Sequence, residues 1–333
     1  MDYFYRMNAL EHLRITFLDH LKNRITENEP AGLYDPVHYI LSLGGKRIRP
    51  LLTMMSAKMY GAPVNDSLDA AVAVEVFHNF TLLHDDIMDA ADLRRGQETV
   101  HKKWDLNTGI LSGDAMLIMA YRLFEGYNKE QFFQLHKVFS KTALEVCEGQ
   151  QYDVDFETRD DVTVPEYLNM IKLKTSVLVG CALQMGAIIA GVKEEEQQLI
   201  YNYGIHLGLA FQLMDDYLDA FGDPATFGKE VGGDIRENKK TYLYLRSIEN
   251  EDCATELKEW FALDHEEMNE DQIEEKKEIV KVFFEASGGA AATLDAIKFY
   301  TDEALSIIET LSISDDSKNE LKKFSLDLMS RVS

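Results

Sequence analysis

The sequence contains few residues that interrupt helices. Only six of its 333 residues are proline, and the ranges 64–164 and 225–333 contain none. The strict alternation of apolar and polar residues that is typical of half-buried strands is almost absent. Apolar residues instead recur every three or four positions, as at Ala70, Val74 and Phe77. The sequence therefore predicts an all-α protein with long helices.

Positive charge is scarce as well. The chain has 34 Lys and Arg residues against 58 Asp and Glu residues, which gives a formal net charge of −24. Such a chain repels phosphate backbones and anionic lipid, so we expect no nucleic-acid partner and no membrane-surface function. The three cysteines, Cys147, Cys181 and Cys253, show no metal-binding spacing. They suit a reducing compartment and predict a cytoplasmic protein.

Long hydrophobic segments are missing too. The most apolar run, 177–192, has about 16 residues, fewer than the roughly 20 that cross a bilayer, and Gln184 interrupts it. We therefore expect a buried core helix there and no transmembrane segment. The N-terminus lacks a basic region followed by an apolar stretch, so no secretory signal is expected. No repeat or linker divides the chain, which predicts a single domain over 1–333 with a solvated acidic segment at 249–277.

Two aspartate motifs carry the strongest functional signal. The motif Asp-Asp-Ile-Met-Asp at 85–89 recurs as Asp-Asp-Tyr-Leu-Asp at 215–219. On a helix, residues four positions apart lie one above the other, so each motif stacks carboxylates whose repulsion a divalent cation would relieve. Carboxylate oxygens favour Mg²⁺, which in proteins usually also binds substrate phosphate. The motifs therefore predict a metal and diphosphate site.

A charged helix surface is the alternative interpretation of each motif. Apolar residues precede both of them, with Phe80 before the first and Phe211 before the second. The aspartates are therefore expected to face inward, where an unpaired charge is costly. We favour the metal site over a solvated surface.

Three basic clusters accompany the aspartates. The first is Gly-Gly-Lys-Arg-Ile-Arg-Pro at 44–50, the second is Arg-Arg-Gly at 94–96, and the third joins Lys229 to the Lys-Lys-Thr sequence at 239–241. Each cluster alone is equally well explained as a solvated patch. In a chain with only 34 Lys and Arg residues, their grouping near the aspartates favours two sites that hold diphosphate by charge-assisted hydrogen bonds.

Taken together, these motifs resemble the trans-prenyl diphosphate synthase family, which includes farnesyl and geranylgeranyl diphosphate synthases. The resemblance runs in the family's order from Gly44 to about Thr241, and it includes the pairs at 149–150, 174–175 and 211–212. It implies a single-domain helical bundle around a deep central cavity. It also implies three Mg²⁺ ions per active site, a homodimer, and isopentenyl and allylic diphosphates as substrates.

The resemblance also assigns roles by position. The implied Mg²⁺ ligands are Asp85, Asp86, Asp89, Asp215, Asp216 and Asp219. The residues implied to bind isopentenyl diphosphate are Lys46, Arg49, His78 and Arg95. Those implied to hold the allylic diphosphate or line the reacting centre are Arg94, Gln150, Lys174, Thr175, Gln212, Lys229 and Lys239. The implied catalytic set consists of Asp85, Asp86, Asp89, Arg94, Lys174, Thr175, Gln212, Asp215, Lys229 and Lys239.

The implied reaction needs no nucleophilic side chain. The allylic C–O bond ionises, the isopentenyl double bond attacks the carbocation, and a proton is lost. Mg²⁺, Lys and Arg neutralise the charge that develops on the diphosphate, which is electrostatic stabilisation. One departure from the family pattern is Asn238, where glycine commonly precedes the lysine; asparagine also tolerates a left-handed backbone.

Three other functions are weaker interpretations. A terpene cyclase normally mixes Asn, Ser or Thr and Glu in its second metal motif, unlike the motif at 215–219. A di-iron bundle needs two Glu-x-x-His motifs, and only the one at Glu75 and His78 is present. An inactive regulatory subunit typically loses the aspartate motifs, which are intact here. A synthase of longer chains remains the alternative within the family.

Residues upstream of the first motif indicate how long the prenyl product can grow. Thr81 lies four positions before Asp85, Phe80 lies five before it, and Phe77 lies about one turn deeper. A bulky Phe80 would block the growing chain, and aromatic residues at such positions resemble short-chain members of the family. The pair Phe80-Thr81 resembles many geranylgeranyl diphosphate synthases, so the sequence favours C20 within a C15 to C20 range.

Replacing this side chain tests the interpretation. Phe80→Ala is expected to lengthen the product because it removes the block, and sizing of the prenyl products after extraction measures the change. An unchanged product spectrum would assign Phe80 to ordinary core packing.

Overall fold

Helices form nearly all of the protein. The computed structural model describes residues 2–26, 28–223, 231–264 and 267–330. Within these residues the only sheet pairs β1 (Leu93–Arg94) with β2 (Gln97–Glu98), two residues each. The predicted all-α fold is therefore confirmed.

The chain divides into two compact units, residues 1–140 with 181–197 and residues 141–180 with 198–333. The single domain over 1–333 therefore stays a prediction. The remaining elements of the first unit are α1 (Asp2–Arg24), α2 (Ala31–Ser42), α3 (Ile48–Met59), η1 (Val64–Ser67), α4 (Leu68–Met88), α5 (Val100–Lys103), α6 (Leu106–Arg122) and η2 (Leu123–Gly126).

The second unit begins within one long helix. The helices that contribute residues to both units are α7 (Lys129–Thr158), α9 (Val177–Ile189) and α10 (Glu194–Phe221). The elements that lie wholly in the second unit are α8 (Val164–Ile171), η3 (Lys172–Ser176), α12 (Gly233–Arg236), α13 (Tyr242–Ser247), α14 (Glu251–Phe261), α15 (Glu270–Ala286), α16 (Gly289–Thr310) and α17 (Asp315–Met329).

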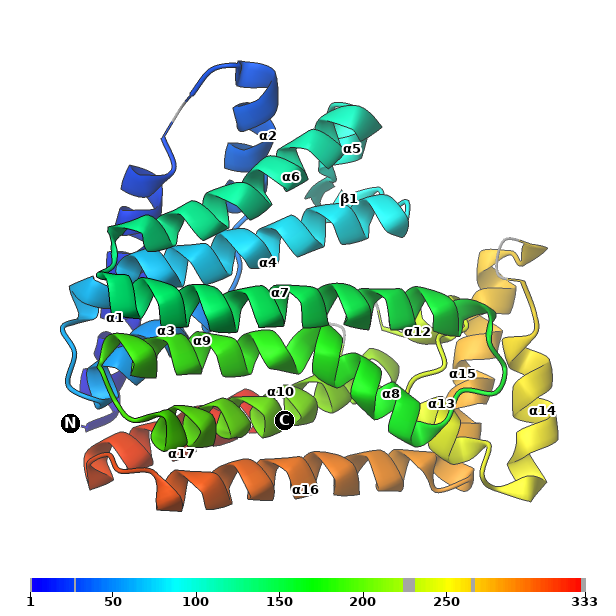
Figure 1. Cartoon of the computed structure of the whole chain (residues 1–333). Helices are drawn as coiled ribbons and strands as arrows, with labels where there is room; N and C mark the ends of the chain where they lie inside the picture. Colours follow the sequence, from blue (N-terminus) through cyan, green and yellow to red (C-terminus); the bar gives the residue numbers. More distant parts are fainter. Residues whose placement is uncertain (1, 27, 224–230, 265–266, 331–333) are drawn as a thin grey trace. The chain divides into compact units, whose positions relative to one another are not determined.

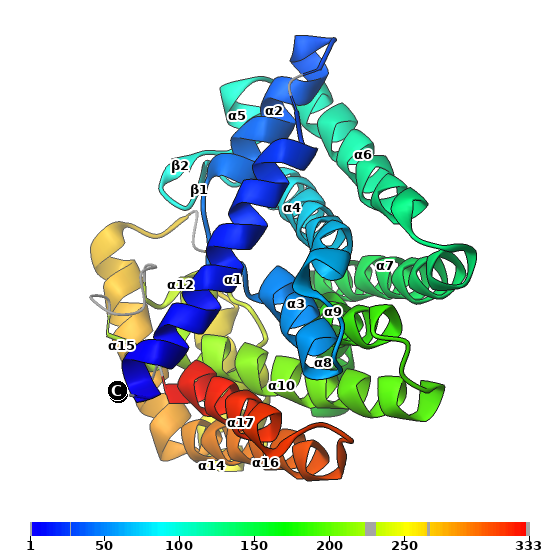
Figure 2. The same cartoon turned by 90° about the vertical axis from the view of Figure 1, so that its left-hand side faces the viewer.

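The first unit is built around α4. Nearly every residue from Leu68 to Phe77 is buried, whereas the spacing of Ala70, Val74 and Phe77 predicted a helix with one buried face. Helices α4 and α6 lie side by side (Figure 1). Their close approach depends on small residues, because a Cβ added at Gly109 would lie 2.9 Å from the Ile87 side chain, and one at Gly113 would overlap the His84 ring. On another side, α1 crosses α3 and α4 (Figure 2).

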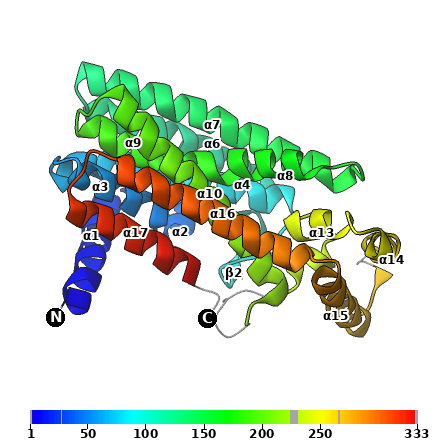
Figure 3. The same ribbon diagram turned by 90° about the horizontal axis from the view of Figure 1, so that it is seen from below.

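Polar contacts fix helices in the second unit. The sequence Thr-Val-Pro-Glu at 163–166 has the pattern of a capping box, and Thr163 and Glu166 form one in the structure, so α8 begins at Val164. The buried Tyr203 hydroxyl of α10 lies 2.9 Å from the Ser325 hydroxyl of α17, and α17 packs beside α16 (Figure 3). Because a buried hydroxyl without a partner is costly, this contact specifies how α10 and α17 meet.

One helical stretch, Val164–Ile189, is long and apolar enough to cross a membrane. Of its most apolar window, 72% is buried inside the protein, as in the core helix of a soluble protein. The run that begins at Val177 is buried as α9, which confirms the predicted core helix.

The packing of α9 against α3 within the first unit makes a stability prediction. A Cβ at Gly186 would lie 2.6 Å from the Ser56 Cβ and 2.7 Å from the Ala57 nitrogen, so Gly186→Ala must push the helices apart. We expect the free energy of unfolding, measured by urea denaturation, to fall by about 2 kcal/mol.

Gly32 in α2 offers the matched control, because nothing lies within 4 Å of an added Cβ. Gly32→Ala is expected to be neutral or to stabilise by up to about 1 kcal/mol. Equal stability of the two variants would contradict the close approach of α9 and α3.

Candidate functional site

The first aspartate motif lies at the C-terminal end of α4. Asp85 and Asp86 occupy its last turn, and Asp89 is the residue that caps it, with its N–H donating to the Asp85 carbonyl at 2.9 Å. The negative end of a helix dipole disfavours carboxylates at this position, and the aspartates also repel one another. A bound cation would relieve both effects.

Arg94 approaches this motif from β1. Its Nε donates to the Asp86 Oδ1 at 2.7 Å, and the Asp86 side chain is only 3% exposed. Burial raises the pKa of Asp86, and Arg94 opposes that rise. The structure therefore joins a predicted metal ligand to a predicted diphosphate-binding residue.

The first basic cluster is a loop of unusual backbone. Gly44, Gly45 and Arg47 have φ values of 85°, 119° and 52°, in the left-handed region. The Arg95 guanidinium donates to the Gly44 carbonyl, and a Cβ at Gly45 would lie 2.9 Å from that guanidinium. Glycine is therefore required at position 45 both for its φ and for the space that Arg95 occupies.

A buried ion pair anchors this loop to α4. The Arg47 and Glu75 side chains are each 3% exposed and form a salt bridge. Arg47 also donates to the Leu41 carbonyl, and the Asn79 amide donates to Glu75 Oε1 at 3.0 Å. The sequence counted Arg47 among the cations of the 44–50 cluster that would hold diphosphate, but the structure buries it against Glu75, to which no role was assigned.

The residues predicted to bind isopentenyl diphosphate meet in the first unit. Arg49 Nη1 lies 3.2 Å from His78 Nε2. Burial, followed by the nearby Arg49 and Arg95 charges, holds the pKa of His78 well below its usual value, so the ring is neutral at pH 7 and its Nε2 accepts a hydrogen bond from Arg49. Lys46, in the same loop, is exposed. This cluster is strongly cationic in an acidic protein.

The second aspartate motif lies near the C-terminal end of α10. Asp216 is buried, accepts hydrogen bonds from the Tyr167 hydroxyl and, at 3.1 Å, from Gln212 Nε2, and Gln212 accepts one from the Thr175 hydroxyl at 3.2 Å. Burial raises the pKa of Asp216 to about 7, with Asp215 adding to that rise. Gln212 and Thr175, which the resemblance implies line the reacting centre, lie beside the motif, and Tyr167 was given no role.

A further aspartate extends this cluster. The backbone N–H of Asp234, in α12, donates to Asp219 Oδ2 at 2.9 Å. Burial, followed by the charges of Asp219 and Asp216, raises the pKa of Asp234 well above its usual value. A recess is lined by these three aspartates and by Lys239. Asp234 was not predicted from the sequence as a site residue. The feature of the sequence that could have indicated it is its position directly after the Gly232-Gly233 pair.

Lysines pair with carboxylates around this recess. Lys174 lies in η3, a single π-helical turn, and its Nζ is 2.6 Å from Asp153. Lys239 Nζ is 2.9 Å from Glu237 and 4.0 Å from Asp234. Two further residues were predicted to bind the allylic diphosphate. Gln150 is half-buried on α7, and Lys229 lies outside the described residues.

The donor set suits Mg²⁺ whose coordination is completed by water and diphosphate. Within the described part of the chain, no group of three or more His, Cys, Asp or Glu side chains forms a metal site by itself. Mg²⁺ commonly binds through one or two carboxylates together with substrate phosphates, so such a site needs no complete protein cage. Burial and mutual repulsion raise the pKa values of Asp216 and Asp234, so their ionised forms are costly without a partner, and a bound cation would stabilise them.

The comparisons with known proteins identify the family. The sequence model of the polyprenyl synthetase family matches residues 30–281. The chain belongs to the polyprenyl synthetase family. It is a prenyltransferase of the trans-prenyl diphosphate synthase type, as the motifs predict.

Similar proteins have closely related names. A geranylgeranyl diphosphate synthase of Methanosarcina mazei is 39% identical over 71% of this chain and 76% of its own, and a geranylfarnesyl diphosphate synthase of Natronomonas pharaonis is 38% identical over 72% and 76%. A crystal structure of a geranylgeranyl pyrophosphate synthase is 79% identical, with a TM-score of 0.95, over 97% of this chain and 99% of that one.

In this chain, the residues predicted to set the product length lie in an aromatic cluster. Phe80 and Phe77 are buried, with ring centroids 5.5 Å apart, and Phe77 contacts Phe139 of α7 at 5.2 Å. Thr81 is half-buried, and its hydroxyl donates to the His78 carbonyl. Phe139, distant in sequence, was not predicted.

The buried pair Arg47 and Glu75 makes a prediction that does not depend on the reaction. Glu75→Leu leaves the Arg47 charge buried without its partner, so the free energy of unfolding is expected to fall by about 3 kcal/mol or more. Adding Arg47→Met is expected to recover most of that loss, because an apolar pair replaces the ion pair. Chemical denaturation of the variants measures both values, and a double variant no more stable than Glu75→Leu would refute the prediction.

Proposed function

We propose that this synthase condenses isopentenyl diphosphate with allylic diphosphates, head to tail, to give a short-chain all-trans prenyl diphosphate, with C20 geranylgeranyl diphosphate as the main product. The observation that carries the proposal is the pairing of aspartate motifs with cations. The first motif ends α4 beside Arg94, and the second lies on α10 beside the recess that Lys239 lines. The 79% identical geranylgeranyl pyrophosphate synthase supports the C20 product.

The aspartates are the proposed Mg²⁺ ligands. Asp85, Asp89 and Asp215 would be the chief ones, and Asp86, Asp216 and Asp219 would support them. Bound Mg²⁺ would supply the positive charge that stabilises a departing diphosphate. Tyr167 and Gln212 orient Asp216 through the hydrogen bonds that they donate to it.

The cations are proposed to bind the two diphosphates. Lys174 and Lys239, now paired with Asp153 and Glu237, would turn to the allylic diphosphate. Isopentenyl diphosphate would be bound by Arg49 of α3, by His78 of α4 and by Arg95, whose guanidinium donates to the Gly44 carbonyl. These residues bind and orient charge, and none of them needs to act as a nucleophile.

Phe80 and Phe77 are proposed to limit the product. Their burial with Phe139 supports a rigid aromatic block, since a packed cluster leaves little room for side-chain movement. A C25 product is the second candidate, because one relative is a geranylfarnesyl diphosphate synthase. The two candidates differ by one isopentenyl unit.

A homodimer in the cytoplasm is also proposed. Leu106, Leu111 and Ile118 of α6 are 53%, 59% and 61% exposed. An exposed apolar face of this kind marks an interaction surface, and a second copy of the chain is the proposed partner. The three cysteines are free thiols, which supports a reducing compartment.

The reaction is tested with purified protein, labelled isopentenyl diphosphate and C5, C10 or C15 allylic diphosphates, with Mg²⁺ or EDTA. We expect a C20 product that appears only with Mg²⁺. Asp215→Asn is expected to lower turnover at least about a hundredfold, whereas Asp302→Asn, at the 57% exposed partner of Lys298 on α16, leaves it unchanged. Much longer products would refute the aromatic block, and no condensation would refute the function.

A further inference from the structure

Two neighbouring lysines in the second unit have opposite environments. Lys239 has a 48% exposed side chain and lines the recess of Asp216, Asp219 and Asp234. The side chain of Lys240 is only 12% exposed and points to the loop between α7 and α8. The Lys239 side chain therefore faces the recess, whereas the Lys240 side chain contacts other residues of the protein.

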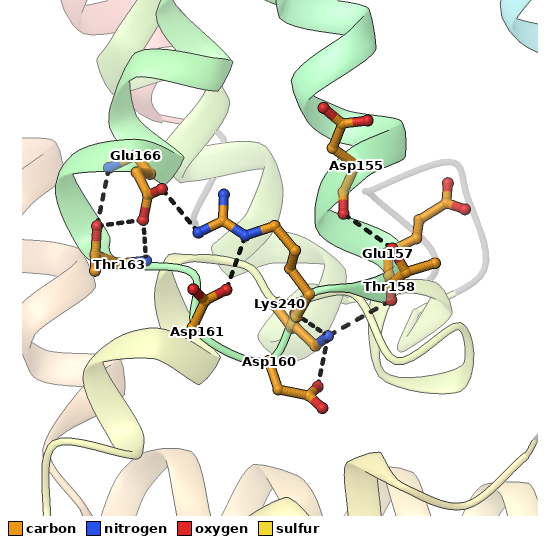
Figure 4. Close-up of polar contacts among 9 residues, drawn as sticks. Asp155, Glu157, Thr158, Asp160, Asp161, Thr163, Glu166 and Lys240 are labelled. Atoms are coloured by element: carbon orange, nitrogen blue, oxygen red, sulfur yellow. Dashed lines mark hydrogen bonds and ion pairs between the residues drawn. The ribbon is translucent and has the colours of Figure 1, made fainter.

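Lys240 binds the end of the helix that carries Asp153. Its Nζ donates to the Arg159 carbonyl and, at 3.5 Å, to the Glu157 carbonyl, and it lies 3.0 Å from the Asp160 carboxylate (Figure 4). Glu157 belongs to the last turn of α7, where carbonyl groups lack helical partners and the helix dipole is negative. Lys240 thus ties the 238–241 segment to the C-terminus of α7.

Asn238 connects the 238–241 segment to Leu263 and to Lys276 of α15. Its side-chain amide donates to the Leu263 carbonyl at 2.8 Å, and its Oδ1 accepts from the Nζ of Lys276 on α15. Lys276 is completely buried, and burial lowers its pKa to about 8. Asn238 also has a left-handed backbone, with φ of 58°.

Backbone hydrogen bonds complete the arrangement. The Lys239 N–H donates to the Asp234 carbonyl and the Thr241 N–H donates to the Lys239 carbonyl, both at 2.9 Å. Lys239 therefore lies between two anchors, one residue away on each side. Its backbone is fixed, while its side chain remains partly exposed.

We propose that Lys240, and Lys276 acting through Asn238, are positioning residues that hold Lys239 for the allylic diphosphate. The proposal rests on the proposed function, because that function makes Lys239 a diphosphate-binding residue. An ammonium group on a fixed backbone loses less conformational entropy on binding than one on a mobile loop, so each anchor contributes to diphosphate affinity without touching the substrate.

The buried Lys276 supports this role. A lysine with no exposed surface costs desolvation free energy, and an apolar side chain of similar length would avoid that cost. A purely structural position would be filled more cheaply by methionine. The Lys276 Nζ lies over the Phe261 ring at 5.8 Å from its centroid, and the hydrogen bond that it provides goes to Asn238, next to Lys239.

A double-mutant cycle separates positioning from general stability. We expect Lys240→Met and Lys276→Met each to raise the KM for geranyl diphosphate about tenfold, with the KM for isopentenyl diphosphate unchanged. In a Lys239→Ala background the same substitutions are expected to change that KM less than about twofold, because the residue that they position is gone. Lys240→Arg, which still donates to carbonyl groups, should restore the wild-type value.

The control is Lys298→Met, which removes one positive charge from the exposed surface of α16 and is expected to change neither KM. An equal rise with and without Lys239 would overturn the proposal, as would unchanged KM values in Lys240→Met and Lys276→Met. Melting temperatures of all variants identify any effect that comes from unfolding alone.

Binding of inorganic pyrophosphate with Mg²⁺, measured by calorimetry, distinguishes the two proposals. Affinity that depends on Lys239 and falls about tenfold in Lys240→Met supports positioning even if no condensation occurs, in which case only the proposed function fails. Condensation by the wild type, together with equal pyrophosphate affinity in the wild type and Lys240→Met, overturns positioning and leaves the function intact.

Discussion

The repulsion between carboxylates at the ends of α4 and α10 is the constraint on which the rest of this structure depends. Each motif places aspartates near the negative end of a helix dipole, in a chain whose net charge is already −24. Burial around Asp216 and Asp234 makes that charge more costly, which is why their pKa values rise. In each unit a basic residue accordingly lies against an aspartate, Arg94 beside Asp86 and Lys239 beside Asp234.

Placing those cations accurately requires buried polar anchors. The ion pair of Arg47 and Glu75 holds the loop before α3 against α4. The Arg95 guanidinium donates a hydrogen bond to the Gly44 carbonyl of the same loop. In the second unit, Tyr167 fixes Asp216, while Asn238 and Lys240 enclose Lys239. Networks of this kind specify one arrangement because every member left without a partner would be costly in the interior.

The sequence predicted what depends on local pattern. Helical periodicity gave the fold class, the capping box gave the start of α8, and the family motifs gave the aspartates with Arg49, His78, Gln212 and Thr175 in contact. It did not predict contacts between distant segments. Tyr167 reaches Asp216 across 49 positions, and Lys276 reaches Asn238 across 38. The segment 249–277 was predicted to be solvated because it is acidic, but the two lysines at its end, Lys276 and Lys277, are buried.

Three of the proposed diphosphate-binding cations are paired with carboxylates, which has a consequence for selectivity. Lys174 is held by Asp153, Arg94 by Asp86 and Lys239 by Glu237. A small anion that arrives alone must displace a carboxylate already held within the protein, which competes at high effective concentration. A diphosphate that arrives with divalent cations supplies new partners for the aspartates while it takes the lysines and arginines. Under the proposed function, an acidic protein with paired cations therefore discriminates against free phosphate and favours the metal-bound diphosphate.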